Sequence, residues 1–188
     1  MRKKLLIIVF VIITSMNLAA QKSKIAFHSI NSASFLIGET NTDWGLQTVN
    51  GFAYKNFFSG IGAGIDYYHY HSYPLFLDQR IYFGKRSNLF AYGDLGYNFN
   101  NEKNKPGSEI GYYGSYHFTG GIYTGIGLGY KQHLGGKSSL TFSAGFSYKQ
   151  ISNRVSVTNE CFTQPCPVDY QNYQYDNGRV DLKAGIDF

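Results

Sequence analysis

Ten charged side chains recur at alternate positions of segments that otherwise carry apolar residues and glycine. They are five acids and five bases: Asp66, Asp78, Asp94, Asp181, Asp187, Arg80, Lys131, Lys149, Arg179 and Lys183. Residues two apart on a strand share one face, so these side chains would point to one side of a sheet. Buried charges are stable only when they are paired. The balance of acids and bases therefore predicts a structural network of ion pairs and hydrogen bonds, with a catalytic or proton-conducting cluster as the alternative.

Two histidines, His69 and His71, are also spaced for chemistry. On a strand this spacing would put both imidazoles on one face, which is a possible metal pair. No third ligand lies within a few residues of them. We therefore expect ordinary histidines at the edge of a sheet, with no metal and no cofactor.

The elements that position these residues are predicted strands, because apolar and small or polar residues alternate with a period of two. Residues 180 to 188 show it most strictly, with apolar side chains at every even position and polar residues or glycine between them. Polar and glycine-rich turns separate eight such stretches. They cover residues 25–38, 44–54, 57–68, 75–83, 89–99, 115–131, 140–149 and 173–188. The longest predicted loops are residues 100–114 and 152–172, and both fall on the same side of an up-and-down sheet.

The amino terminus predicts export. Basic residues at 2–4, an apolar run at 5–13 and the small residues of Leu18-Ala19-Ala20 are typical of a secretory signal peptide, here residues 1–20. The apolar run is well short of the ~20 residues of a spanning helix. The chain has 17 basic and 12 acidic residues, and removing the three basic residues of this leader lowers the excess to two. We therefore expect no nucleic-acid partner.

The composition of residues 21–188 points to a lipid environment. Charged residues make up 15% of the chain and aromatic residues 18%, and there are 22 glycines. Soluble proteins carry about 25% charged residues. Only helices and closed barrels can span lipid, because every backbone polar group must be paired within the protein. The strand pattern therefore predicts a closed barrel, with a soluble sandwich or lipocalin-like barrel as the alternative.

The two cysteines, Cys161 and Cys166, fall within the second long loop. In an exported protein an even pair predicts a disulfide. Redox-active pairs more often have the spacing Cys-x-x-Cys, so we expect this disulfide to be structural.

The carboxyl end carries a resemblance to a known family. Phe188 in last place, behind the apolar positions Leu182, Ala184 and Ile186, resembles the assembly signal of bacterial outer-membrane barrels, although that family often has Tyr or Phe where Ile186 stands. The chain from about residue 25 to 188 resembles the small OmpA/OmpX-type proteins. The resemblance implies an all-β fold, an eight-stranded antiparallel up-and-down transmembrane β-barrel in the outer membrane of a Gram-negative bacterium. It also implies outer-membrane lipid and the barrel-assembly machinery as partners.

An enzyme is the alternative to a structural protein. Some barrels of this shape modify lipid A with a Ser, a His and an acid near the rim, and Ser115, His117 and Glu109 are the best such set in this chain. Triads are defined by geometry, and these three have no diagnostic spacing. We expect a monomeric, non-catalytic barrel with a plugged lumen, acting in envelope structure, adhesion or surface interaction with an extracellular partner. A lipid-modifying enzyme and a narrow channel remain the alternatives.

Overall fold

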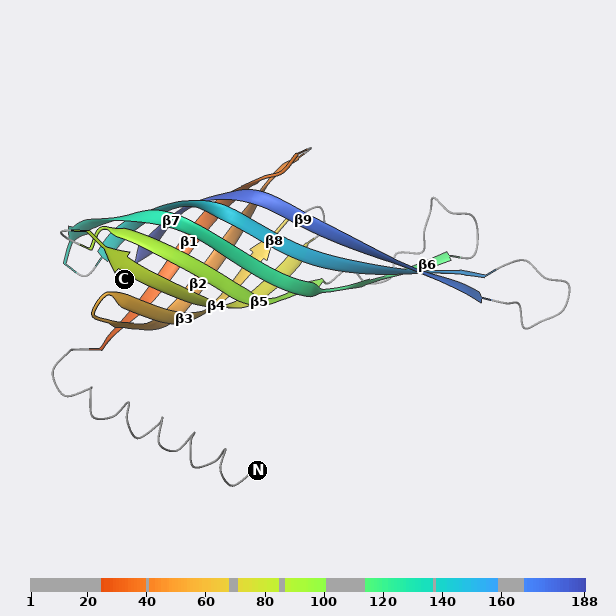
Figure 1. Cartoon of the computed structure of the whole chain (residues 1–188), viewed down its shortest axis with the longest axis horizontal. Coiled ribbons are helices and arrows are strands. Elements are labelled where there is room, and N and C mark those ends of the chain that lie inside the picture. The colour runs from red at the N-terminus through yellow and green to blue at the C-terminus, as the bar shows by residue number, and fades with distance from the viewer. Residues whose placement is uncertain are drawn as a thin grey trace, which may run out of the picture.

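The computed structural model describes residues 25–39, 41–67, 71–84, 87–100, 114–136, 138–158 and 168–188. Antiparallel strands make up nearly all of this part of the chain (Figure 1). The strands are β1 (Ala26–Ile37), β2 (Thr42–Tyr54), β3 (Phe57–Asp66), β4 (Ser72–Phe83), β5 (Leu89–Asn100), β6 (Gly114–Thr119), β7 (Gly121–Gly135), β8 (Ser138–Thr158) and β9 (Val168–Asp187). No helix in the described ranges is long and apolar enough to cross a membrane. The predicted signal peptide lies outside these ranges.

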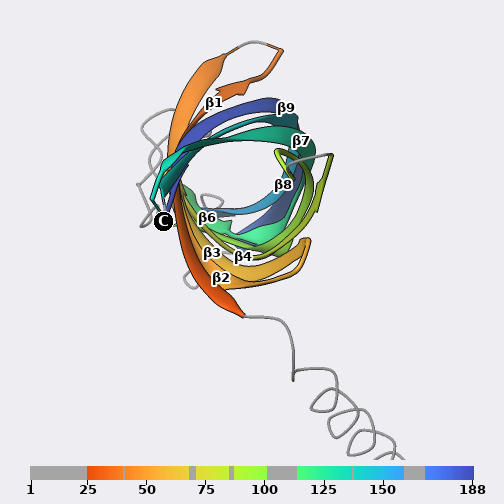
Figure 2. The ribbon, with the colours of Figure 1, turned by 90° about the vertical axis from the view of Figure 1, so that its left-hand side faces the viewer.

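The strands form a closed ring, which Figure 2 shows end-on. The strands pair in chain order, except that β5 pairs with β7 and β6 pairs with β8. Strand β9 closes the ring by pairing with β1, from Ile30 opposite Asp187 to Ile37 opposite Val180. Segments β6 and β7 both pair with β8 and follow one another along it, so together they make one member of the ring. The prediction of an eight-stranded antiparallel up-and-down barrel is therefore confirmed.

The sixth predicted strand, residues 115–131, is interrupted at Gly120. A side chain at Gly120 would overlap the carbonyl oxygen of Asn98, so only glycine allows the chain to pass there. The pairing with β8 slips by one residue at this point, since Thr119 lies opposite Ser152 whereas Tyr123 lies opposite Lys149. Unbroken alternation through residues 115–131 would point Thr119 into the barrel, and this slip instead puts it in phase with the outward residues of β8.

The predicted loop at residues 152–172 is wrong for most of its length. Strand β8 continues to Thr158 and β9 begins at Val168, and the two pair as a hairpin that extends beyond the barrel (Figure 1). Polar residues on both faces of this extension hid the period-two pattern. The extension needs no apolar face, because backbone pairing with the neighbouring strand holds it.

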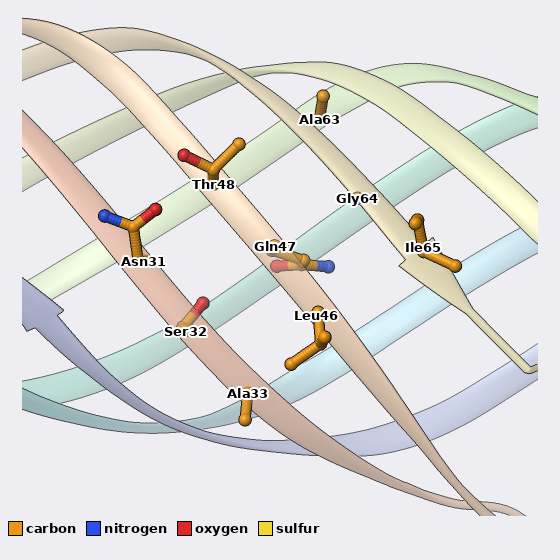
Figure 3. Close-up of a pocket in the computed structure, with 9 residues that line it drawn as sticks. All are labelled: Asn31, Ser32, Ala33, Leu46, Gln47, Thr48, Ala63, Gly64 and Ile65. Carbon is orange, nitrogen blue, oxygen red and sulfur yellow. The ribbon is translucent and has the colours of Figure 1, made fainter.

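The outward face of the ring is mainly apolar and the inward face is mainly polar or small. Ile61, Leu95 and Ile126 are 62%, 63% and 68% exposed on the outside. In β1 and β2, whose alternation is weak in the sequence, Ala33 and Leu46 point outward (Figure 3). Ser34 and Gly45 are buried inside. The alternation therefore assigned most faces correctly, and the structure resolves the two strands where it was weak.

Large rings inside the barrel lie over glycines of neighbouring strands. A Cβ atom on Gly62 would overlap the ring of Phe76, and one on Gly129 would overlap the ring of Phe90. Phe76 also belongs to a buried apolar cluster in the lumen, and the other members are Ile30, Val49, Phe58 and Tyr123. The glycines on the inward face thus make room for the rings of neighbouring strands.

Candidate functional site in the lumen

The structure places all ten of the charged residues singled out above inside the barrel. None of their side chains is more than 10% exposed, and each takes part in an ion pair. Four of these ion pairs join different strands, and the pairs Arg80–Asp78 and Lys183–Asp181 each lie within one strand. This arrangement is the candidate functional site, and we call it the lumen network.

At the end of the barrel near the carboxyl terminus, Asp187 holds two partners. Lys131 Nζ lies 2.5 Å from Asp187 Oδ2, and His28 Nδ1 lies 2.7 Å from Asp187 Oδ1. His28 was not predicted as a member, because polar residues on both faces of β1 concealed its facing. Strands β1, β7 and β9 are joined by this one carboxylate.

Arg80 and Asp78 form a two-pronged pair along β4. Arg80 Nε donates to Asp78 Oδ1 at 2.8 Å, and Nη2 donates to Oδ2 at 2.7 Å. The guanidinium lies 5.8 Å from the ring centre of Phe58 and 5.2 Å from that of Phe90. Two parallel hydrogen bonds and two ring faces fix this arginine more firmly than a single ion pair would.

The middle of the lumen holds one lysine between two acids. Lys183 Nζ lies 3.3 Å from both Asp94 Oδ2 and Asp181 Oδ2, and 4.7 Å from the ring centre of Tyr92. Asp94 and Asp181 come from strands on different sides of the ring, β5 and β9. The ammonium therefore neutralises two carboxylates that would otherwise repel each other across the lumen.

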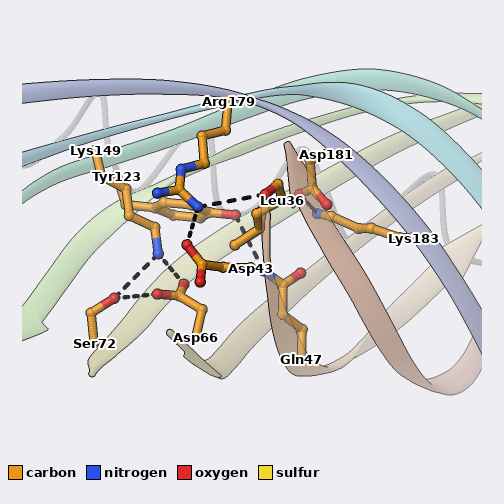
Figure 4. Close-up of polar contacts among 10 residues, drawn as sticks. All are labelled: Leu36, Asp43, Gln47, Asp66, Ser72, Tyr123, Lys149, Arg179, Asp181 and Lys183. Carbon is orange, nitrogen blue, oxygen red and sulfur yellow. Dashed lines mark hydrogen bonds and ion pairs between the residues drawn. The ribbon is translucent and has the colours of Figure 1, made fainter. Parts of the chain in front are cut away.

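Lys149, Asp66 and Ser72 form the next cluster, shown in Figure 4. The Lys149 ammonium pairs with the Asp66 carboxylate, and the Ser72 hydroxyl donates to the other oxygen of that carboxylate. Lys149 Nζ also lies 3.3 Å from Ser72 Oγ and 5.3 Å from the ring centre of Tyr123. The cluster links β8 to the facing ends of β3 and β4.

The ion pair at the end of the lumen nearest the long hairpin contains Asp43, which lies between two of the strands predicted from the sequence. Arg179 Nη1 donates to Asp43 Oδ2 at 2.5 Å and lies 3.5 Å from the carbonyl oxygen of Leu36 (Figure 4). Asp43 was placed in the polar turn at residues 39–43, whereas β2 already begins at Thr42. Its position one residue before Trp44, in phase with inward residues of β2, is the signal that could have found it.

The network alternates charges with aromatic rings. Arg80, Lys149 and Lys183 each lie over a ring, and so does Lys131, whose Nζ is 5.4 Å from the ring centre of Tyr82. Eight-stranded barrels have an interior that side chains can just fill. Each of these four cations contacts both a carboxylate and a ring, so the arrangement can hold the wall strands together and occupy the lumen.

The other candidate sites fall largely outside the described residues. These include His69, Glu109, Cys161 and Cys166, so the predicted disulfide and the alternatives of a metal pair and a triad stay untested. Ser115 and His117 lie in β6, with their backbones opposite Ser156 and Arg154. His71 stacks edge-on against Tyr67 at 4.6 Å. Within the described ranges, no group of three His, Cys, Asp or Glu residues is placed to hold a metal ion.

The four residues of the predicted assembly signal lie at the seam of the ring. Leu182, Ala184 and Ile186 point outward from β9, between the outward residues of β8 and β1. Phe188 follows the strand, and its backbone N–H and C=O bond to the C=O and N–H of Ser29 at 3.1 and 3.2 Å. The last residue of the chain is thus fixed to the first ring strand.

No protein-family model and no curated protein matches the sequence. Among solved structures, the chain is similar to outer membrane protein AlkL, determined by solid-state NMR in DMPC lipid bilayers. The two share 11% sequence identity over 86% of this chain and 88% of that one, with a TM-score of 0.39. This similarity is too low to assign a family, so membership of the OmpA/OmpX-type group stays a prediction. The closed ring itself establishes the fold, that of an eight-stranded antiparallel β-barrel.

Proposed function

We propose that the chain is an integral outer-membrane protein whose barrel spans the membrane, whose lumen is plugged, and which acts without catalysis through its external hairpin. The observation that supports this most is the distribution of side chains across the barrel wall. Large apolar side chains cover the outside at exposures of 40% and more, while paired charges and rings fill the inside. A water-soluble barrel would have the opposite arrangement.

The outward surface is the part of the molecule that requires lipid. Contiguous apolar patches of more than a few hundred Å² are rare on soluble monomers, because they cost free energy in water. Closure of the ring pairs the backbone groups that an open sheet edge would expose to hydrocarbon. A spanning strand needs about 9–11 residues, and the shortest uninterrupted ring strand, β3, has 10.

Aromatic residues at both ends of the outer surface support the same orientation. Phe27 and Phe52 stack at 5.7 Å towards the end that carries the carboxyl terminus. Trp44 and Tyr67 stack at 4.3 Å at the end that carries the long hairpin. Membrane interfaces favour aromatic residues at both boundaries. The long hairpin would then lie outside the cell, because outer-membrane barrels have their longer connections on that side.

The external part of the hairpin offers a polar surface to partners. A shallow cleft of about 290 Å³ lies beside β6, and its lining includes Ser152, Arg154, Asn172 and Gln174. Arg154 Nε donates to Asn172 Oδ1 at 3.1 Å and holds two of these side chains in place. Hydroxyls, amides and a guanidinium favour a partner with many hydrogen-bonding groups. Adhesion or surface interaction through this hairpin is therefore the proposed role.

Membrane insertion and the plugged lumen can be tested together. Purified protein should stay soluble only with detergent, should enter lipid vesicles, and should show no stepwise conductance in planar bilayers. Steady conductance steps would contradict the plugged lumen and support the alternative of a narrow channel. Solubility without detergent would overturn the membrane assignment itself.

The surface role is tested by removing the tip of the hairpin in cells. Deleting residues 153–172 should abolish surface binding and leave envelope integrity intact, because β1 to β5, β7 and the remaining parts of β8 and β9 keep their pairing, although β6 loses its partner. The substitutions Arg154→Ala and Asn172→Ala, made together, are the matched control for loss of the cleft without shortening. Mass spectrometry of lipid A in cells with and without the gene addresses the enzyme alternative, and a changed lipid A would refute the non-catalytic role.

A further inference from the structure

The outer wall formed by β1 to β4 carries polar side chains in the middle of its apolar band. The six residues are Ser29, Asn31, Thr48, Asn50, Ser59 and Gln79, and we call them the amide patch. They lie on the outward face, each in phase with exposed apolar neighbours. This inference rests on the proposed function, since the patch is unusual only if the wall faces lipid.

The patch lies between apolar residues on both sides along each strand. On β2, Leu46 and Phe52 flank Thr48 and Asn50, and the two flanking side chains are 51% and 60% exposed. On β4, Leu77 and Ile81 flank Gln79 in the same way, at 54% and 57%. The polar groups therefore lie within the apolar band, with large apolar side chains on both sides of them along β2 and β4.

The six side chains form one continuous area. Asn31 lies opposite Thr48, and Ser29 lies opposite Asn50, across the β1–β2 pairing. Ser59 lies opposite Gln79 across the β3–β4 pairing, and Phe52 lies opposite Ser59 across β2–β3. Since Asn50 is two residues from Phe52 on the same face, Asn50 and Ser59 are diagonal neighbours.

The amides keep hydrogen-bonding capacity after their contacts within the chain. Asn31 Nδ2 donates to Ser29 Oγ at 3.4 Å, Asn50 Nδ2 to Thr48 Oγ1 at 3.5 Å, and Gln79 Nε2 to Ser59 Oγ at 2.7 Å. Among the residues that the structure describes, the amide oxygens of these three side chains have no donor. An amide has two N–H donors and an oxygen with two lone pairs, so each retains both a donor and an acceptor.

The surface beside the patch is hollowed where small side chains meet. A groove of about 570 Å³ runs over β1, β2 and β3, and Figure 3 shows its lining. The small side chains of Ala33, Thr48 and Ala63 form the floor of this groove, and the larger side chains of Leu46 and Ile65 also line it. Small residues that let backbones approach, combined with polar side chains, are typical of contacts between proteins within a membrane.

We propose that the amide patch and this groove form the contact between two copies of the barrel within the membrane. Lipid tails carry no donor or acceptor and leave the amides unsatisfied, at a free-energy cost. A two-fold axis through the patch brings the same amides together from both copies. Because each amide both donates and accepts, the surface is complementary to itself, and Leu46 or Ile65 of one copy can enter the groove of the other. This dimer replaces the monomer expected from the sequence.

Cysteine cross-linking tests the contact directly. In a background with Cys161→Ser and Cys166→Ser, Ala63→Cys places a thiol in the groove, and Ala144→Cys places a matched thiol on the opposite wall, where Ala144 is also outward and exposed. In vesicles of phosphatidylethanolamine and phosphatidylglycerol at high lipid dilution, Ala63→Cys should form cross-linked dimers about tenfold more than Ala144→Cys. Equal yields would indicate random collision and overturn the proposal.

Removing the amides tests their role in the same vesicles. The triple variant Asn31→Leu, Asn50→Leu and Gln79→Leu should lose dimers by about tenfold or more, because several hydrogen bonds between the two barrels in lipid are lost together. Thr124→Leu removes a polar outward residue of β7 and should leave the dimer unchanged. Unchanged dimers in the triple variant, or cross-links only to a different protein, would overturn the self-association.

Folding and insertion are read separately from association. Each variant should show the shift in gel mobility on heating that reports a folded barrel, so that a variant that fails to fold is recognised. A protein that inserts into vesicles but stays monomeric refutes the dimer alone. A protein that does not enter vesicles refutes the proposed function.

Discussion

The lumen network and the amide patch are two groups of polar side chains on opposite faces of the same wall, and they differ in where their partners lie. Lys149 and Asp66 are 83 residues apart in the sequence and meet inside the barrel. The side-chain amide of Asn50 donates to Thr48, two residues away, and keeps a donor and an acceptor to spare. Polar groups that serve the fold are satisfied by the chain itself. Polar groups left incomplete on the outside point instead to another molecule.

This difference predicts separate consequences for the two regions. Breaking a contact in the lumen leaves a buried charge without its partner, so the free energy of unfolding should fall. Removing an amide from the patch leaves an apolar side chain on an apolar wall, so the fold should tolerate it. The expected effects below run from the largest to the smallest.

Arg80→Met should give the largest loss of stability. Methionine preserves packing against Phe58 and Phe90 but leaves the Asp78 carboxylate unpaired in the lumen. Breaking a buried pair costs about 3–5 kcal/mol, and denaturant unfolding in detergent micelles measures it. The double variant Arg80→Met with Asp78→Leu should recover most of the loss. A single variant as stable as the parent would show that the lumen network does not stabilise the barrel.

Gly129→Ala tests how tightly the inside is packed compared with the outside. The added Cβ would overlap the ring of Phe90 and lie 2.7 Å from the carbonyl oxygen of Phe142. Overpacking of this kind costs about 1–3 kcal/mol in unfolding free energy. Gly93→Ala, on the outward face of β5 with open space around it, is the matched control and should be nearly neutral. Equal effects at the two glycines would remove the distinction between a filled lumen and an open outer wall.

Asn50→Leu should change the unfolding free energy of the monomer by no more than about 1 kcal/mol, in the stabilising direction, because it removes a polar group from an apolar face. The measurement uses detergent micelles dilute enough to keep the barrels apart. Thr124→Leu on the opposite wall should behave in the same way. A loss of several kcal/mol for Asn50→Leu alone would mean that the patch belongs to the fold and would remove the contrast with the lumen.

Tyr148→Phe should produce the smallest change, confined to one carboxyl group on the exposed part of the hairpin. Tyr148 Oη donates to Asp176 Oδ1 at 2.7 Å, and this hydrogen bond lowers the pKa of Asp176 below its ordinary value. Its contribution is present above the ordinary pKa and is lost as pH falls through the lowered pKa. In the variant, carbon NMR of the carboxyl group should show the pKa of Asp176 rising toward the ordinary value. An unchanged titration would contradict the assigned cause.

The sequence predicted most of the ring because its signal is the period-two alternation, which pairing and lipid both reinforce. It succeeded where one face is apolar and the other is glycine or charge, as in β3 and β9. The extended hairpin was missed because residues outside the apolar band have no reason to alternate. The interruption at Gly120 was missed because a slip between two strands depends on the backbone of a third, at Asn98.

The site shows the same limit. Each of the ten charges was placed on the inward face by parity alone, but parity cannot say which acid meets which base. Lys183 bridges Asp94 and Asp181, although Asp181 is two residues away and Asp94 is 89 residues away. His28 and Asp43 were missed because the alternation is weakest in β1 and at the start of β2. Partner choice is a property of the ring geometry, which only the three-dimensional structure supplies.

The pairing between β1 and β9 determines when the ring can close. The first ring strand has no second neighbour until residues 180–188 arrive, and Phe188 itself forms the final two backbone bonds with Ser29. Closure of the ring therefore requires the strands at both ends of the described part of the chain. A barrel without residues 180–188 would leave β1 with an open edge, and its backbone N–H and C=O groups there would lack the partners that the ring now supplies.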